Sequence, residues 1–163
     1  MKRVISLIIA AALALFLVPA AHASGGYQGW GPRLGLTMDP DQFHFGAHAD
    51  LSTGKRNLRL QPNLELGLGN DLTVLSLQLD GAFRLNSNWD AWSPYLGGGV
   101  GWYVIGDGDD GIANGKTTNG AGLSPLVGIE RGLSSGSRYF IEAKVGFFDA
   151  PEVKLTTGWT FHP

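Results

Sequence analysis

The chain has 163 residues, of which 25 are glycine and none is cysteine. Its 12 basic and 14 acidic side chains give a formal net charge of −2, which provides no electrostatic reason to bind nucleic acid. Because no disulfide can form, stability must come from packing, from closure of a sheet or from a lipid environment.

Residues 1–23 have the pattern of a secretory signal peptide. Lys2 and Arg3 precede an apolar run from Val4 to Val18, and Ala21-His22-Ala23 is a small-x-small cleavage site. We expect cleavage before Ser24, which leaves a single mature domain over residues 24–163. A membrane anchor helix is the alternative, but the apolar run is shorter than the roughly 18 residues that a spanning helix requires.

The mature chain then alternates between apolar and polar residues, which predicts strands because successive side chains of an extended chain point to opposite faces. The first two predicted strands cover residues 30–38 and 43–51. Leu58 to Leu85 follows as a hairpin around Asn70-Asp71. A two-residue turn there pairs Gly69 with Leu72 and Leu64 with Leu77, so that both leucine rows share one face.

Four further strands follow, over residues 92–105, 121–133, 139–148 and 153–161. The one long connection is the glycine-rich and acidic stretch from Gly106 to Asn119. The mature chain therefore contains eight predicted strands, with no helical periodicity among them.

The polar faces of these strands carry as many positive as negative charges. The five cations are Arg33, Arg59, Arg84, Lys144 and Lys154, and the five carboxylates are Asp50, Glu65, Asp80, Glu130 and Glu142. Such a balance suits the inside of a closed barrel, because buried ions persist only when they are paired and hydrogen-bonded. We therefore interpret these ten residues as a structural network in the lumen.

The opposite faces are rich in leucine and carry aromatic residues near strand ends, among them Trp30, Tyr139, Trp159 and Phe161. Aromatic rims around an apolar band are typical of the two water interfaces of a membrane, and strands of about 9 to 11 residues suit its thickness. The pattern predicts an all-β fold, an eight-stranded antiparallel up-and-down membrane barrel with its apolar side outward.

In strand number, alternation, signal peptide and absence of cysteine the chain resembles the small eight-stranded outer-membrane barrels with an OmpA/OmpX-like domain. The resemblance implies an outer-membrane location, contact with membrane lipid and with the barrel-assembly machinery, and a monomer. Family members end in an alternating strand with a terminal aromatic residue. Here Val153, Leu155, Trp159 and Phe161 match, but His162 and Pro163 follow.

Three functional alternatives remain open at this point. Lipid A deacylases also use a barrel of this size, but they place a His and a Ser two residues apart on a strand, and no His-x-Ser occurs in any predicted strand. A soluble periplasmic lipocalin-like barrel would instead turn its leucines inward around an apolar ligand. Asp80, Arg84 and their neighbours are also candidates for a proton or ion path. We expect no catalytic role and no cofactor.

Two groups of residues are candidate metal ligands. His44 and His48 share one strand face, but four residues of extended chain separate them by about 13 Å, too far for one ion. Asp107, Asp109 and Asp110 could gather calcium, although they lack the spacing of an EF-hand. We interpret this acidic stretch as a solvated outer loop and as a possible recognition site.

Four prolines fall within predicted strands, at positions 32, 62, 94 and 125. A closed barrel has no edge on which a missing N–H donor is harmless. We therefore expect bulges or strand starts at these positions.

Overall fold

The structure is a computed structural model that describes residues 26–70, 72–87, 89–107, 112 and 116–162. The predicted signal peptide and its cleavage site lie outside the described residues. Within the described part of the chain, no helix is long and apolar enough to cross a membrane.

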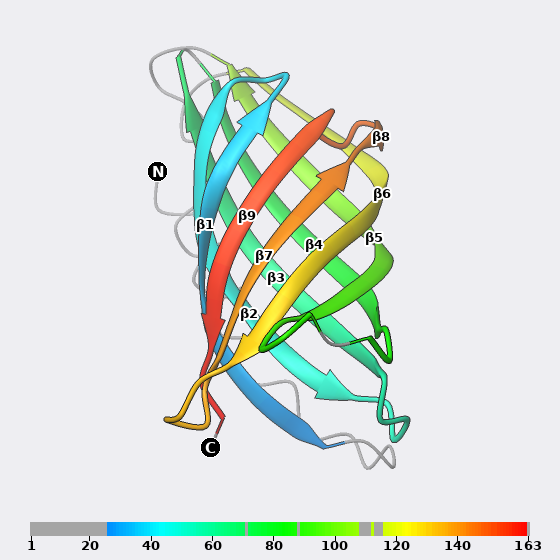
Figure 1. Ribbon diagram of the computed structural model, residues 1–163. Helices are drawn as coiled ribbons and strands as arrows, with labels where there is room; N and C mark the ends of the chain where they lie inside the picture. Colours follow the sequence, from blue (N-terminus) through cyan, green and yellow to red (C-terminus); the bar gives the residue numbers. More distant parts are fainter. Residues whose placement is uncertain (1–25, 71, 88, 108–111, 113–115, 163) are drawn as a thin grey trace.

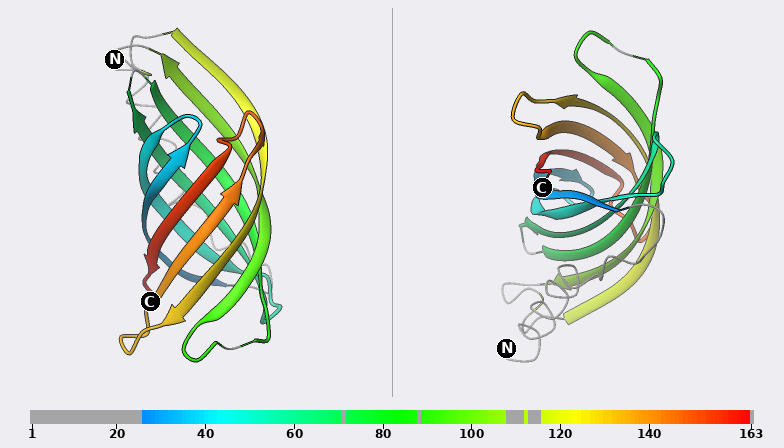
Figure 2. Two further views of the ribbon diagram at one scale, coloured as in Figure 1. Left: turned by 45° about the horizontal axis from the view of Figure 1, so that its top comes forward. Right: turned by 90° about the horizontal axis from the view of Figure 1, so that it is seen from below.

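The strands form one closed antiparallel sheet (Figures 1 and 2). They are β1 Tyr27–Met38, β2 Gln42–Ser52, β3 Leu58–Gly69, β4 Leu72–Arg84, β5 Ser93–Asp107, β6 Lys116–Gly132, β7 Arg138–Val145, β8 Phe147–Phe148 and β9 Val153–Thr160. Strands β1 to β7 pair in chain order, β8 pairs with β6, β7 pairs with β9, and β1 pairs with β9 to close the barrel. Because β7 and β8 are two parts of one interrupted strand, the predicted eight-stranded up-and-down barrel is confirmed.

The β3–β4 hairpin has the predicted register. Gly69 pairs with Leu72, Leu64 with Leu77, and Glu65 with Ser76. The alternation of two-residue period therefore sets which face every side chain of this hairpin occupies.

The predicted loop from Gly106 to Asn119 is shorter than expected. Strands β5 and β6 continue to pair beyond the apolar part of the sequence, with Gly106 opposite Thr117 and Asp107 opposite Lys116. Both faces of this extension are largely polar, so hydrophobic alternation could not reveal it. Of the three predicted recognition residues, Asp107 ends β5, whereas Asp109 and Asp110 lie outside the described residues.

Three of the prolines occupy interruptions in the ladders, and the prediction of bulges there is wrong. On the side of β1 that faces β9, Trp30 pairs with Phe161 and Arg33 pairs with Gly158, but Pro32 between them has no partner. On the other side, Pro32 pairs with β2. Pro62 faces an equivalent gap on its β2 side, and Pro125 faces the break between β7 and β8. The N–H donor that each of these three prolines lacks therefore falls on the side of its strand where the pairing is interrupted. Pro94 lies at the predicted strand start.

The distribution of side chains is inverted relative to a water-soluble protein. Among the described residues, 21 polar or charged residues are buried, but only six hydrophobic ones are. The leucine rows point outward, with Leu77 48 % and Leu79 45 % exposed. This is opposite to the inward leucine face that a lipocalin-like ligand cavity requires.

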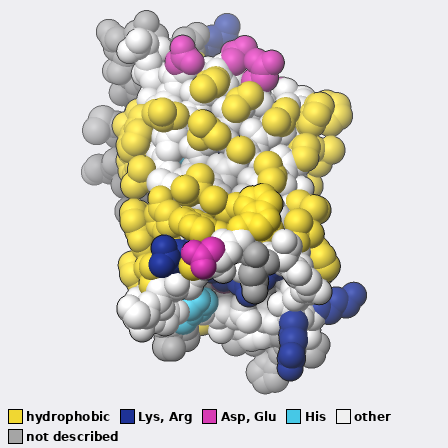
Figure 3. Space-filling model, in the orientation of Figure 1, with side chains coloured by type: hydrophobic (Ala, Val, Ile, Leu, Met, Phe, Trp, Pro, Cys, Tyr) yellow, Lys and Arg dark blue, Asp and Glu magenta, His cyan; other side chains and the backbone are white. Residues whose placement is uncertain are grey.

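Exposed large hydrophobic side chains come from all the strands β1 to β9, and on the face seen in Figure 3 they form a broad belt. One margin of the belt carries an aromatic cluster in which Trp30 contacts Phe161 and Tyr139 contacts both Trp92 and Trp159. This cluster lies where β1 begins and β9 ends, which we call the terminal end; the opposite end, with the turns 39–41 and 149–152, is the distal end. The space-filling view shows charged side chains mainly beyond the two margins of the belt.

Interior glycines make room for the large side chains of the lumen. A Cβ on Gly128 would lie 2.3 Å from the Tyr95 ring and 2.7 Å from the Ile141 carbonyl oxygen. A Cβ on the outward-facing Gly98 would meet nothing closer than 3.6 Å. Large residues therefore fill the interior only beside small ones.

This contrast predicts that Gly128→Ala lowers the free energy of unfolding by about 1–3 kcal/mol, because overpacking forces the neighbouring groups to shift. Gly98→Ala should leave it unchanged or raise it slightly. Urea unfolding of the two variants, followed by tryptophan fluorescence, checks this. Equal losses in both would mean that the Tyr95 ring does not occupy the space beside Gly128.

Candidate functional site

The polar interior is the candidate functional site. All ten charged residues predicted to line the lumen project into it, and nine of them are buried. The tenth, Arg84, lies at the terminal end with 42 % of its side chain exposed. The ten residues divide between two clusters.

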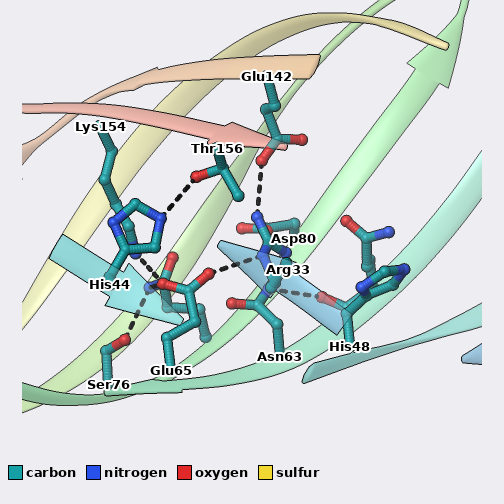
Figure 4. A network of polar contacts seen from close by, with 12 residues as sticks. Arg33, His44, His48, Asn63, Glu65, Ser76, Asp80, Glu142, Lys154 and Thr156 are labelled. Carbon is teal, nitrogen blue, oxygen red and sulfur yellow. Dashed lines mark hydrogen bonds and ion pairs between the residues drawn. The ribbon is translucent and has the colours of Figure 1, made fainter. Parts of the chain in front are cut away.

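Six side chains form the central cluster: Arg33, Lys144, Lys154, Glu65, Asp80 and Glu142. Arg33 bridges two carboxylates, with its Nε 2.7 Å from Glu65 Oε1 and its Nη2 3.0 Å from Glu142 Oε1 (Figure 4). Lys154 pairs with Glu65 from the other side, and Lys144 pairs with Asp80. Three cations meet three carboxylates, so the cluster is formally neutral, as burial demands.

Neutral polar groups occupy further positions around these ions. Asn63 Nδ2 donates to Asp80 Oδ2 at 2.8 Å, and Tyr95 Oη donates to Glu142 Oε2 at 3.1 Å. Lys144 donates to Gln78 Oε1 at 3.1 Å. These bonds fix the positions of the charged groups in a region of low dielectric, where an unpaired group is costly.

The mouth cluster lies nearer the terminal end and consists of Asp50, Arg59, Arg84, Glu130 and Arg138. Glu130 is its centre, since Arg59 Nη1 lies 2.6 Å from Oε2, Arg84 Nε 2.6 Å from Oε1 and Arg138 Nε 3.3 Å from Oε2. Arg138 also pairs with Asp50. Three arginines therefore face two carboxylates, and one positive charge is left over.

Tyr95 connects the two clusters. Its hydroxyl bonds Glu142 of the central cluster, while the guanidinium of Arg59 lies 4.6 Å from its ring centroid. Phe140 on β7, in the same buried cluster as Tyr95, lies next to His48, and the Arg33 guanidinium is 5.7 Å from its ring centroid. Aromatic faces thus add cation–π stabilisation to two buried arginines.

The two histidines pair with threonine hydroxyls inside the barrel. His44 lies 3.0 Å from Thr37 Oγ1 and 3.0 Å from Thr156 Oγ1, and His48 Nε2 lies 2.9 Å from Thr160 Oγ1. His48 and Thr160 are 3 % and 0 % exposed, so the pair has no access to a substrate in the membrane or in water. Within the described ranges, no group of three or more His, Cys, Asp or Glu side chains is arranged to hold a metal ion.

Two members of the interior were missed by the sequence reasoning. Arg138 precedes the predicted strand 139–148 and was assigned to no element, yet β7 begins with it. Its spacing of four from Glu142 puts it on the same face and could have revealed it. Phe140 lies between them on that face and is 1 % exposed, but its apolar character hid its inward orientation.

Comparisons with solved structures give the same fold. The crystal structure of Neisserial surface protein A (NspA) aligns with a TM-score of 0.64 at 11 % identity, over 86 % of this chain and 97 % of that chain. The N-terminal β-barrel domain of Pseudomonas aeruginosa OprF aligns with a TM-score of 0.57 at 10 % identity, over 83 % and 98 %. The de novo designed TMB2.3 aligns with 0.52 at 11 % identity, over 84 % and 95 %.

No family model and no curated protein matches the sequence. The structural likeness shows that the chain has the fold of the small eight-stranded outer-membrane barrels. The resemblance of fold inferred from the residues is thereby confirmed.

Proposed function

We propose that the chain is an exported outer-membrane protein whose barrel crosses the membrane, with a structural or surface-exposed role and no catalysis. One observation carries the proposal: the apolar belt faces outward all around a barrel whose interior is polar and ion-paired. Exposed apolar patches on soluble monomers are usually limited to a few hundred Å². A belt that surrounds the whole barrel requires a lipid environment.

We propose that the protein is not catalytic because the polar groups of the interior form ion pairs and hydrogen bonds with one another. The carboxylates of the central cluster are each paired with a cation, and the histidines are bonded to buried threonines. A protein of this design contacts membrane lipid and the assembly machinery, crosses the membrane as a monomer and needs no cofactor. We infer that its signal peptide is removed on export.

The orientation follows from the positions of the strand ends and of the charges. Most exposed acids lie at the distal end, at Asp39, Asp41, Asp149 and Glu152, and most exposed bases at the terminal end, at Lys55, Arg56 and Arg131. Asp90 at the terminal end and Lys116 at the distal end are the exceptions. We propose that the terminal end faces the periplasm and the distal end faces outward. The β5–β6 connection, with Asp107 at its start, is then the proposed site of surface recognition.

Two measurements in one preparation test the proposal. We expect the expressed protein to be recovered with outer membranes, to resist extraction by urea and to dissolve in detergent. We also expect faster gel migration before boiling than after, because a closed barrel stays compact in detergent. Recovery in the soluble periplasmic fraction would contradict the membrane location, whatever the fold.

A further inference from the structure

The terminal end of the barrel contains a recess that the proposed structural role leaves unexplained. Its volume is about 540 Å³, and it opens between the β2–β3, β4–β5 and β6–β7 connections. Its charged and titratable lining comprises Arg56, Arg84, Arg138, Glu130 and His162. It is large enough for a small solute or a lipid headgroup.

The charge of this lining is unbalanced. The single carboxylate of the lining, Glu130, is already shared among Arg59, Arg84 and Arg138. Arg56 adds a further cation, which is exposed at the lip of the recess. Four arginines therefore face the two carboxylates of the mouth cluster, Asp50 and Glu130, and two positive charges remain formally uncompensated.

The recess also holds donors with unused capacity. Arg138 is 93 % buried, given its 7 % exposure, and its Nε makes no hydrogen bond within the described residues although it lies 3.3 Å from Glu130. The half-exposed Arg84 directs Nε and Nη2 at Glu130, which leaves its Nη1 for another acceptor. A buried arginine donor without an acceptor is costly unless an anion or water satisfies it.

The central cluster provides an internal comparison. There, three cations meet three carboxylates, so the formal charge is balanced. Arg33 Nε and Nη1 also make no hydrogen bond within the described residues, so the two clusters differ in net charge and not in unused donors. The excess of positive charge thus lies in the mouth cluster, beside a recess that opens to solvent.

We propose that this recess binds an oxyanion, a phosphate group above all, between Arg56 and Arg84 with Arg138 behind them. Planar guanidinium groups recognise phosphate oxygens through paired N–H donors, which suits a site built from arginine. Ser93 and Ser137, which also line the recess, supply polar contacts at its edge. The phosphate can belong to a free solute or to the headgroup of a membrane lipid, and the chemistry of the site is the same for both.

The test is a titration of the folded, detergent-solubilised protein with inorganic phosphate, followed by NMR of the arginine Nε–H groups and of the Gly136 and Ser137 amides. We expect saturable shifts at these positions that sodium chloride at equal ionic strength does not reproduce. Arg56→Gln should weaken binding about tenfold, because it removes a charge-assisted hydrogen bond. Arg84→Gln should do the same.

Lys55→Gln is the matched control, since Lys55 carries the same charge as Arg56 and is also exposed, but does not line the recess. It should change the affinity less than twofold. Equal losses for Lys55→Gln and Arg56→Gln would overturn the proposal, and so would the absence of saturable shifts. Because the titration uses purified protein in detergent, its outcome tests the phosphate site separately from the proposed outer-membrane location.

A second arm identifies the source of the phosphate. The titration is repeated in nanodiscs of phosphatidylcholine, with and without phosphatidylglycerol. If phosphatidylglycerol alone shifts the recess resonances and abolishes the response to added phosphate, the ligand is a lipid headgroup. If the response to phosphate persists unchanged, the ligand is a free anion. Either result supports an oxyanion site.

Discussion

Reversal of one interior charge, Glu65→Lys, is expected to prevent the barrel from folding. Glu65 is 1 % exposed and lies between Arg33 and Lys154, so lysine at this position would bring three buried cations together. Loss of one partner of a buried ion pair costs about 3–5 kcal/mol, and reversal of the charge adds repulsion. That is a large part of the roughly 5–15 kcal/mol by which a typical domain is stable.

Glu152→Lys is the matched control for this prediction. It makes the same chemical change at an exposed distal residue whose backbone N–H, and not its side chain, contacts Asp39. We expect the control to refold into detergent with the mobility of the original protein, while Glu65→Lys remains in the unfolded band. Equal folding of both variants would mean that the polar face is in contact with bulk water.

A charged side chain introduced on the outer face should lower the free energy of unfolding more, the deeper it lies in the membrane. Leu77 lies near the middle of β4 and is 48 % exposed, so in a soluble protein Leu77→Arg would change stability little. In a membrane barrel, arginine at the bilayer midplane costs about 2–4 kcal/mol and near an interface about 0–1 kcal/mol.

Leu68→Arg provides the comparison near the interface. Leu68 also points outward, at 46 % exposure, but lies one residue before the distal end of β3. We expect reversible unfolding from lipid vesicles to show a loss for Leu77→Arg that is clearly larger than the loss for Leu68→Arg. Similar small losses would indicate that water, and not hydrocarbon, surrounds the belt.

The sequence predicted best those features that depend on neighbouring strands. In the β3–β4 hairpin, a tight turn and the alternating pattern determine both register and face, since a slip of one residue would exchange the leucines with the polar set. The same alternating pattern predicted that the ten charged residues lie inside the barrel. Strand ends were predicted less well, because β5 and β6 pair beyond the belt, where apolar alternation no longer marks the faces.

The partners across the lumen could not be predicted from the sequence. Arg33 meets Glu142, 109 positions away, and Glu65 meets Lys154, 89 positions away. These contacts depend on the tilt and stagger with which the barrel closes and on how far each side chain reaches. The sequence therefore indicated a balanced set of charges, but neither the neutral central cluster nor the positive surplus at the mouth.

The membrane location requires that the outward leucine rows of the barrel face lipid. Because the chain contains no cysteine, a single nitroxide label can be introduced through Leu77→Cys, with Glu152→Cys as a label beyond the belt. The measurement is electron paramagnetic resonance of the protein in vesicles, with oxygen as the lipid-soluble relaxing agent and a nickel chelate as the aqueous one. We predict that the label at position 77 responds to oxygen and is protected from nickel, whereas the label at position 152 responds to nickel. Strong nickel accessibility at position 77 in the membrane-bound protein would mean that the leucine rows do not face lipid.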